Sequence, residues 1–166
     1  MRFILIILAL LYDSTCVAQK NCIIDLNSTN NKVEYILLAD SLQKQDFVTR
    51  NKKRFLPKSI KRALKCKANN KFRIANPDKP YNAGDAIIKN WPRRKINYIG
   101  LNKNYLILSY EHGGFGHHSH TLIFKYNKKN IEKVYSLIAS AKSKEETISY
   151  LHFLELHPNL ISYTEF

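Results

Sequence analysis

The stretch "YLILSYEHGGFGHHSHTLIFKYN", residues 105–127, is typical of two β-strands joined by a glycine-rich loop. Side chains alternate between the two faces of a strand, so even-numbered and odd-numbered residues face opposite ways. The even-numbered residues are Leu, Phe and Tyr, with histidines near the loop, and the odd-numbered set is mixed and more polar. Pairing even with even gives one apolar face, whereas a slip of one residue would scatter the apolar side chains. The stretch therefore predicts an antiparallel hairpin with the five-residue loop Gly113–His117.

This pairing predicts that three histidines lie together at the loop end of the apolar face. His112 faces His118 across the two strands, and Tyr110 faces His120. Cross-strand Cβ atoms lie about 4.5–5.5 Å apart, so three imidazoles could share one ion. Imidazole nitrogens are ligands of Zn²⁺ and other borderline metals, and three of them leave one coordination position open. The sequence therefore indicates a candidate zinc site.

Two other interpretations of the histidines stay open. The spacing H-x5-H-x-H is not a strong metal motif, and no neighbouring aspartate is placed to orient the rings. The histidines could instead form a metal-free, pH-sensitive recognition rim, or they could be structural and bond to Tyr110 or to the backbone. On the same register His117 lies in the loop, and Glu111 points to the opposite face.

The loop glycines have a simpler explanation. Gly113, Gly114 and Gly116 allow positive φ angles in a tight loop, and they present Phe115 at its tip. An exposed phenylalanine on such a loop is a candidate contact residue, and we predict that it binds a partner together with His117.

Outward from the hairpin, short polar connections at 102–104 and 127–130 indicate an antiparallel meander. Periodic apolar segments predict a helix near each end, because they carry apolar stripes and capping residues. The resulting fold class is α+β: a single domain with an antiparallel sheet of about four or five strands packed with an N-terminal and a C-terminal helix. The predicted strands are 71–75, 95–101, 105–112, 118–126 and 131–139, and the predicted helices are 32–45 and 144–157.

The segment from Arg50 to Arg73 holds eleven Lys and Arg residues and no Asp or Glu. A short helix inside it would bury Ile60 and Leu64 and present cations on the opposite face. The chain has a formal charge of +14, which favours polyanions such as nucleic acid, anionic lipid or wall polymer. A simple solvated face, enriched in lysine by AT-rich codons, is the alternative. The predicted partner-binding cations are Lys58, Lys61, Arg62 and Lys65.

Residues 1–18 resemble a secretory signal peptide, with Arg2 before an apolar run and a cleavage point after Ala18. The apolar run is too short to cross a bilayer as a helix. The alternative is a lipoprotein acylated on Cys16. Cleavage would leave residues 19–166 as one α+β domain, exported to the periplasm or the medium and without a transmembrane segment.

Two cysteines, Cys22 and Cys66, would remain after removal of the signal. In an exported protein two cysteines most simply form one disulfide. Closing a loop of this length would stabilise the fold by roughly 4 kcal/mol in the chain-entropy model. Two unpaired buried thiols are the alternative.

No complete catalytic motif is present: the sequence has no G-x-S-x-G elbow, P-loop or dinucleotide fingerprint. We therefore predict a small exported binding protein rather than an enzyme, for example of the inhibitor or immunity type, with a protein or an anionic polymer as its partner. Its contacts would be the Gly/His-rich hairpin and the basic helix face. Two alternatives stay open. One is a metal-dependent or histidine-based hydrolase acting on a phosphate-rich or cell-wall substrate, and the other is a binder of anionic surfaces or polymers, nucleic acid included.

Overall fold

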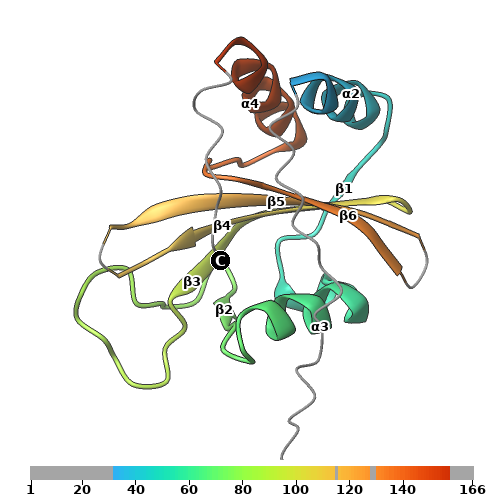
Figure 1. Cartoon of the computed structure of the whole chain (residues 1–166). Helices are drawn as coiled ribbons and strands as arrows, with labels where there is room; N and C mark the ends of the chain where they lie inside the picture. The colour runs from blue at the N-terminus through green and yellow to red at the C-terminus, as the bar shows by residue number, and fades with distance from the viewer. Residues whose placement is uncertain (1–31, 115, 128–129, 158–166) are drawn as a thin grey trace, which may run out of the picture.

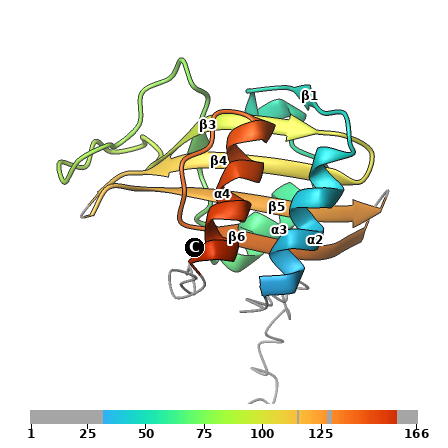
Figure 2. The same ribbon diagram turned by 90° about the horizontal axis from the view of Figure 1, so that it is seen from above.

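The computed structural model describes residues 32–114, 116–127 and 130–157. Within these ranges an antiparallel sheet lies between helices on both of its faces (Figure 1). Helices α2 (Lys32–Gln43) and α4 (Lys144–Leu156) lie side by side on one face, and α3 (Lys58–Lys67) covers the other (Figures 1 and 2). The predicted α+β class, with an N-terminal and a C-terminal helix on one compact domain, is confirmed.

The sheet has the strand order β1-β3-β4-β5-β6, and β2 pairs with β3 in parallel. The four long strands follow one another as the predicted meander. The short β1 and β2 and a 3-10 helix, η2, lie in the basic segment and around it. The bounds are β1 Val48–Thr49, η2 Lys53–Phe55, β2 Ile74–Ala75, β3 Arg94–Leu101, β4 Tyr105–His112, β5 His118–Asn127 and β6 Asn130–Leu137.

The register of the β4–β5 hairpin is the predicted one. Tyr110 is paired with His120, and His112 is paired with His118, with no irregularity between these strands. The even-numbered residues of both strands form one core with α3, in which Leu108 is fully buried and Ile60 and Leu64 are the buried residues of the helix. The alternation of apolar side chains therefore decides the pairing, as expected from the two-residue period of a strand.

The opposite face of the hairpin, expected to be mixed and polar, is also buried in its central part. Ile107 lies on this face in a second core with α2 and α4. The hydroxyl of Thr121 donates to the carbonyl of Ala139 at 2.9 Å, and that of Ser109 accepts from the Ala141 N–H at 3.0 Å. Because these two hydroxyls bond the chain that crosses between β6 and α4, both polar side chains are buried with a hydrogen-bond partner.

Several predictions from the sequence fall outside the described residues. These include the signal peptide 1–18 and Cys22, the predicted disulfide partner of Cys66. Cys66 itself lies on α3, and the disulfide stays a prediction. None of the helices in the described ranges has the length and apolar character needed to span a membrane.

Candidate metal centre

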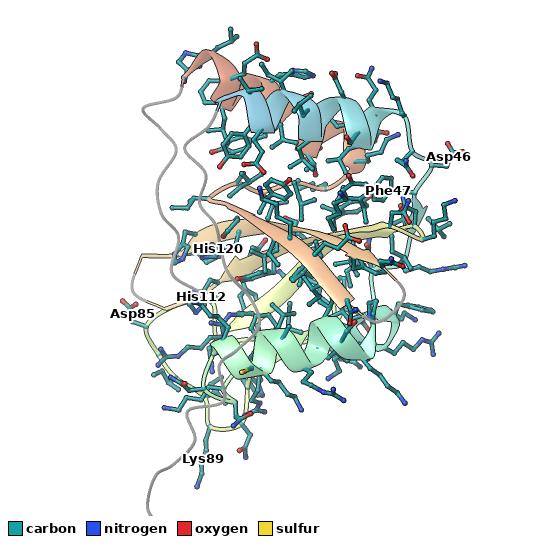
Figure 3. The ribbon with its side chains drawn as sticks, turned by 45° about the vertical axis from the view of Figure 1, so that its right-hand side comes forward. Asp46, Phe47, Asp85, Lys89, His112 and His120 are labelled. Atoms are coloured by element: carbon teal, nitrogen blue, oxygen red, sulfur yellow. The ribbon has the colours of Figure 1, made fainter. Side chains whose placement is uncertain are left out.

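Three adjacent strands place their side chains in a small array at the end of the sheet where β4 and β5 are connected. A bulge in β3 between Ile96 and Tyr98 shifts the alternation of that strand, so Arg94 lies on the same face as the histidines. In Figure 3 His112 and His120 lie at this end of the sheet. From β3 through β4 to β5, one row is Arg94–His112–His118 and the next is Ile96–Tyr110–His120.

The three predicted histidines are brought together. The ring centroids lie 5.2 Å apart for His112 and His118, 4.6 Å for His118 and His120, and 6.1 Å for His112 and His120. One nitrogen from each ring lies within 4.8 Å of the other two. A tetrahedral site with Zn–N bonds of about 2.0–2.1 Å needs nitrogens roughly 3.4 Å apart. Coordination of one zinc ion by all three rings would therefore require their nitrogens to approach one another by up to about 1.4 Å.

The tautomer of His118 follows from its neighbour in the loop. Its Nδ1 lies 2.5 Å from the carbonyl oxygen of Gly116. A carbonyl oxygen can only accept, so Nδ1 carries the proton and the lone pair of the neutral ring is on Nε2. Metal-binding histidines are commonly oriented in this way by a carbonyl or a carboxylate. Within the described ranges no aspartate is bonded to these rings, and the backbone orients His118 instead.

His120 is the most deeply placed of the three, with 3% of its surface exposed. Neither of its ring nitrogens has a hydrogen-bond partner. Across the described residues four buried side-chain polar atoms lack a partner: both nitrogens of His120, the hydroxyl oxygen of Tyr110 and Nε of Arg94. An unpaired buried polar group costs about 1–3 kcal/mol. Since all four belong to this one array, the array has the character of a binding site.

His112 and His120 are neutral at physiological pH. Burial, the positive charge of Arg94 and the neighbouring His118 lower the pKa of His112 to about 4. Burial, His118, His112 and Arg94 lower the pKa of His120 to about 4 as well. Because a metal binds the unprotonated imidazole, these two rings are in the form that a metal requires.

Two further side chains complete the array. The ring of Tyr110 stacks on His120 with centroids 5.3 Å apart, and burial raises the pKa of Tyr110 to about 12 against the opposing charge of Arg94. The Tyr110 hydroxyl is therefore a hydrogen-bond donor at neutral pH. The guanidinium of Arg94 lies over the ring of Phe72, with Cζ 4.9 Å from the ring centroid. Arg94 is buried and has no ion pair within the described ranges.

His117 and Glu111 do not belong to the array. Nε2 of His117 lies 3.8 Å from the carboxylate of Glu111, which also accepts from the Tyr81 hydroxyl at 2.5 Å and pairs with Lys95 at 3.2 Å. Burial raises the pKa of Glu111, but Tyr81, Lys95 and His117 together lower it further, so the net shift is downward. The predicted separation of Glu111 and His117 from the other three histidines is confirmed.

The loop 76–93 lies against the hairpin, which sequence reasoning did not anticipate. Gly113 N–H donates to the Arg93 carbonyl at 2.8 Å, and Gly114 N–H donates to the Ala83 carbonyl at 3.3 Å. A Cβ atom on Gly113 would lie 1.9 Å from the backbone oxygen of Asn82. Of the three loop glycines only Gly114 and Gly116 have positive φ. Gly113 is instead required by close approach of two backbones.

Gly113→Ala is expected to lower the free energy of unfolding by about 1–3 kcal/mol, because the added methyl group must displace the 76–93 loop. Gly84→Ala is the matched control in the same loop, since a Cβ there meets nothing within 4 Å. Urea unfolding of both variants measures the difference. Equal stability of the two variants would contradict this account of Gly113.

The predicted basic face lies on α3. Lys58, Arg62 and Lys65 are exposed, and Lys61 donates from Nζ to the carbonyl of Arg54 at 3.2 Å. None of these cations forms an ion pair with a residue in the part of the chain that the structure describes. The amphipathic helix is confirmed, and its role in binding stays a prediction. Phe115, the other predicted contact, lies outside the described residues.

Arg94 is the residue of the array that the sequence did not reveal. The predicted strand 95–101 begins one residue after it, and side-chain alternation without a bulge would place Arg94 on the face opposite to Ile99. Comparison of the chain with protein-family models, curated proteins and solved structures found no match. The function is therefore inferred from the geometry and chemistry of the array.

Proposed function

We propose that this protein binds one borderline divalent metal ion, preferably Zn²⁺, through His112, His118 and His120. The supporting observation is that one nitrogen from each ring lies within 4.8 Å of the others, on two paired strands that hold the rings side by side. The buried and unpartnered ring of His120 gains the most from a metal, because coordination satisfies a nitrogen that the fold leaves without a bond.

The ligand set favours zinc over calcium or magnesium. Hard cations need several carboxylate or carbonyl oxygens, whereas three imidazoles suit zinc, copper or nickel. Three protein ligands also leave one position of a tetrahedral zinc ion open. The orientation of His118 by the Gly116 carbonyl supports the same assignment, since it directs the lone pair to Nε2.

A binding role is favoured over hydrolysis. Hydrolysis by a zinc-bound water needs a nearby general base, and the acidic residue of the hairpin, Glu111, is engaged on the opposite face by Tyr81 and Lys95. Two of the metal ligands, His112 and His118, stand on either side of the loop Gly113–His117. Metal binding would therefore join both ends of the loop that carries the proposed contacts Phe115 and His117. The proposal is thus a zinc-dependent recognition protein, exported and of the inhibitor or immunity type.

Metal analysis of the protein without an affinity tag tests this function. We expect about one equivalent of zinc after incubation with the ion and desalting, and a titration against a chromophoric chelator that fits a single site. Calcium or magnesium in excess should not displace the zinc. If no ion is retained and none competes with the chelator, the proposed function is wrong.

A further inference from the structure

We infer that the same array also binds an oxyanion, a carboxylate or a phosphate group, between the open position of the metal and the side chains of Arg94 and Tyr110. This inference rests on the proposed metal site. Two features are left unexplained by zinc binding to the histidines: the buried charge of Arg94 and the buried hydroxyl of Tyr110. A third reason is the repulsion between a bound metal ion and the guanidinium of Arg94.

Arg94 is a buried cation with no acidic partner in the described ranges. The residue has 8% of its surface exposed, and its Nε has no hydrogen-bond acceptor. The cation–π contact with the face of Phe72 compensates only part of the free-energy cost of burying this charge. Buried guanidinium groups are normally paired with a carboxylate or a phosphate, which they bind through two parallel hydrogen bonds. The surroundings of Arg94 therefore lack the anion that its chemistry requires.

Tyr110 supplies a second donor next to Arg94. Its side chain is fully buried and its ring stacks on His120. Its hydroxyl lies beside the guanidinium of Arg94, but it makes no hydrogen bond of normal geometry. Arg94 is paired with His112, and Tyr110 with His120, so both donors lie on the same sheet face as the metal ligands. An oxyanion at this place would accept bonds from two buried donors and contact the ion through another of its oxygens.

The repulsion between a bound zinc ion and Arg94 is the third reason to expect an oxyanion at this site. Zn²⁺ at the histidines would add two positive charges to a poorly solvated region that already contains the guanidinium of Arg94. Repulsion between these cations is strong because the local dielectric is low. An oxyanion shared by both offsets the repulsion, so zinc and the anion should each raise the affinity for the other. Zinc alone would leave Arg94 without a counter-ion.

The experiment measures zinc affinity at buffered free zinc and constant ionic strength, in chloride alone, with inorganic phosphate or with acetate. For the wild-type protein we expect phosphate or acetate to raise the zinc affinity at least about fivefold, which is the lower end of ordinary coupling between two sites. A larger effect of phosphate indicates a phosphorylated ligand, and a larger effect of acetate indicates a carboxylate.

Arg94→Gln should bind zinc more tightly than the wild-type protein in chloride, because the repulsion is removed, and should lose the response to the anion. Lys95→Gln is the matched control: it removes the same charge from the next residue, which lies on the opposite face beside Glu111. If Arg94→Gln does not fold, Arg94→Lys serves in its place. It retains the charge but lacks the planar fork, so the response to the anion should fall while the affinity in chloride stays near that of the wild type.

The outcomes separate the two proposals. Zinc binding that is indifferent to phosphate and acetate overturns the oxyanion inference and leaves the metal site standing. An anion response that survives in the Arg94 variants also overturns it. Failure of the wild-type protein to bind zinc in any of the three buffers overturns the proposed function, and the inference that rests on it.

Discussion

His120→Ala is expected to lower the affinity of the protein for zinc by at least about a hundredfold. Loss of a residue that only orients a metal ligand already costs 10- to 100-fold, and His120 is a proposed ligand itself. Of the three rings it is also the one held most firmly, since it is buried and stacks on Tyr110. Competition with a chromophoric chelator measures the change.

The matched control for this experiment is His117→Ala. His117 lies in the same hairpin, but its side chain is 50% exposed and its Nε2 faces Glu111 on the other side of the sheet. We expect the zinc affinity of this variant to equal that of the wild-type protein. Equal losses in the two variants would mean that zinc binding is not confined to the three histidines of the array and depends on the loop as well.

His118→Ala tests whether the loss of zinc affinity in His120→Ala comes from a destabilised fold rather than from a missing ligand. Removing the buried ring of His120 creates a cavity that can destabilise the core, whereas His118 is only partly buried. His118→Ala should therefore lose zinc binding while its metal-free form unfolds at nearly the wild-type urea concentration. Circular dichroism of both metal-free variants establishes whether a loss of affinity reflects a missing ligand or a missing fold.

The hairpin and its histidine array could be predicted from the sequence because the information is local. In residues 105–127 one pairing alone puts the leucines, Phe124 and the inward tyrosines on one face, and a two-residue period leaves no intermediate choice. The position of each histidine follows from that pairing. Hence the position of the histidine cluster follows from the hairpin alone and does not depend on the rest of the fold.

The other face of the hairpin could not be predicted in the same way. Ser109 and Thr121 belong to the face expected to be mixed and polar, yet their hydroxyls bond the chain at Ala141 and Ala139. That segment is distant in the sequence, and no residue of the two strands indicates that it will pack against them. A small polar residue whose partner comes from another element is therefore indistinguishable from an exposed one in the sequence.

Arg94 and Gly113 were misjudged for related reasons. The bulge between Ile96 and Tyr98 changes which residues of β3 share a face, and a bulge has no firm sequence signature. The need for glycine at 113 comes from the backbone of Asn82, which is far away in the chain. Both errors concern the surroundings of the histidines. The sequence thus predicted the clustering of the three histidines but missed the features that give the array its charge and its shape.

Acidification is expected to destabilise the metal-free protein between about pH 6.5 and pH 4, and the same two histidines are the cause. In the folded protein the pKa of His112 and of His120 is about 4, whereas an unfolded histidine titrates near 6.5. The unfolded chain therefore binds more protons within this window, so the free energy of unfolding falls as the pH falls. The full contribution is present above pH 6.5, and it is lost as the pH drops through about 4.

The effect of His120 alone is roughly 3 kcal/mol, because a pKa difference of one corresponds to about 1.4 kcal/mol. The pair contributes less than twice that, since the charge of His112 is itself one cause of the shift at His120. Glu111 acts at lower pH: its pKa lies below the usual 4.5, so its stabilising contribution is lost only as the pH falls through that lower value. The loss above pH 4.5 can therefore be attributed to the histidines.

Urea unfolding at pH 7.5, 5.5 and 4.5 in the presence of a chelator measures this dependence. The double variant His112→Gln/His120→Gln cannot titrate at these positions, so its stability should change much less over the same range. His117→Gln should behave as the wild-type protein does, since its ring is half exposed beside Glu111. A double variant that loses as much stability as the wild type would show that acid acts elsewhere, for example through the self-repulsion of a chain with a formal charge of +14. That result would contradict the conclusion that the fold holds His112 and His120 in the neutral form that a metal requires.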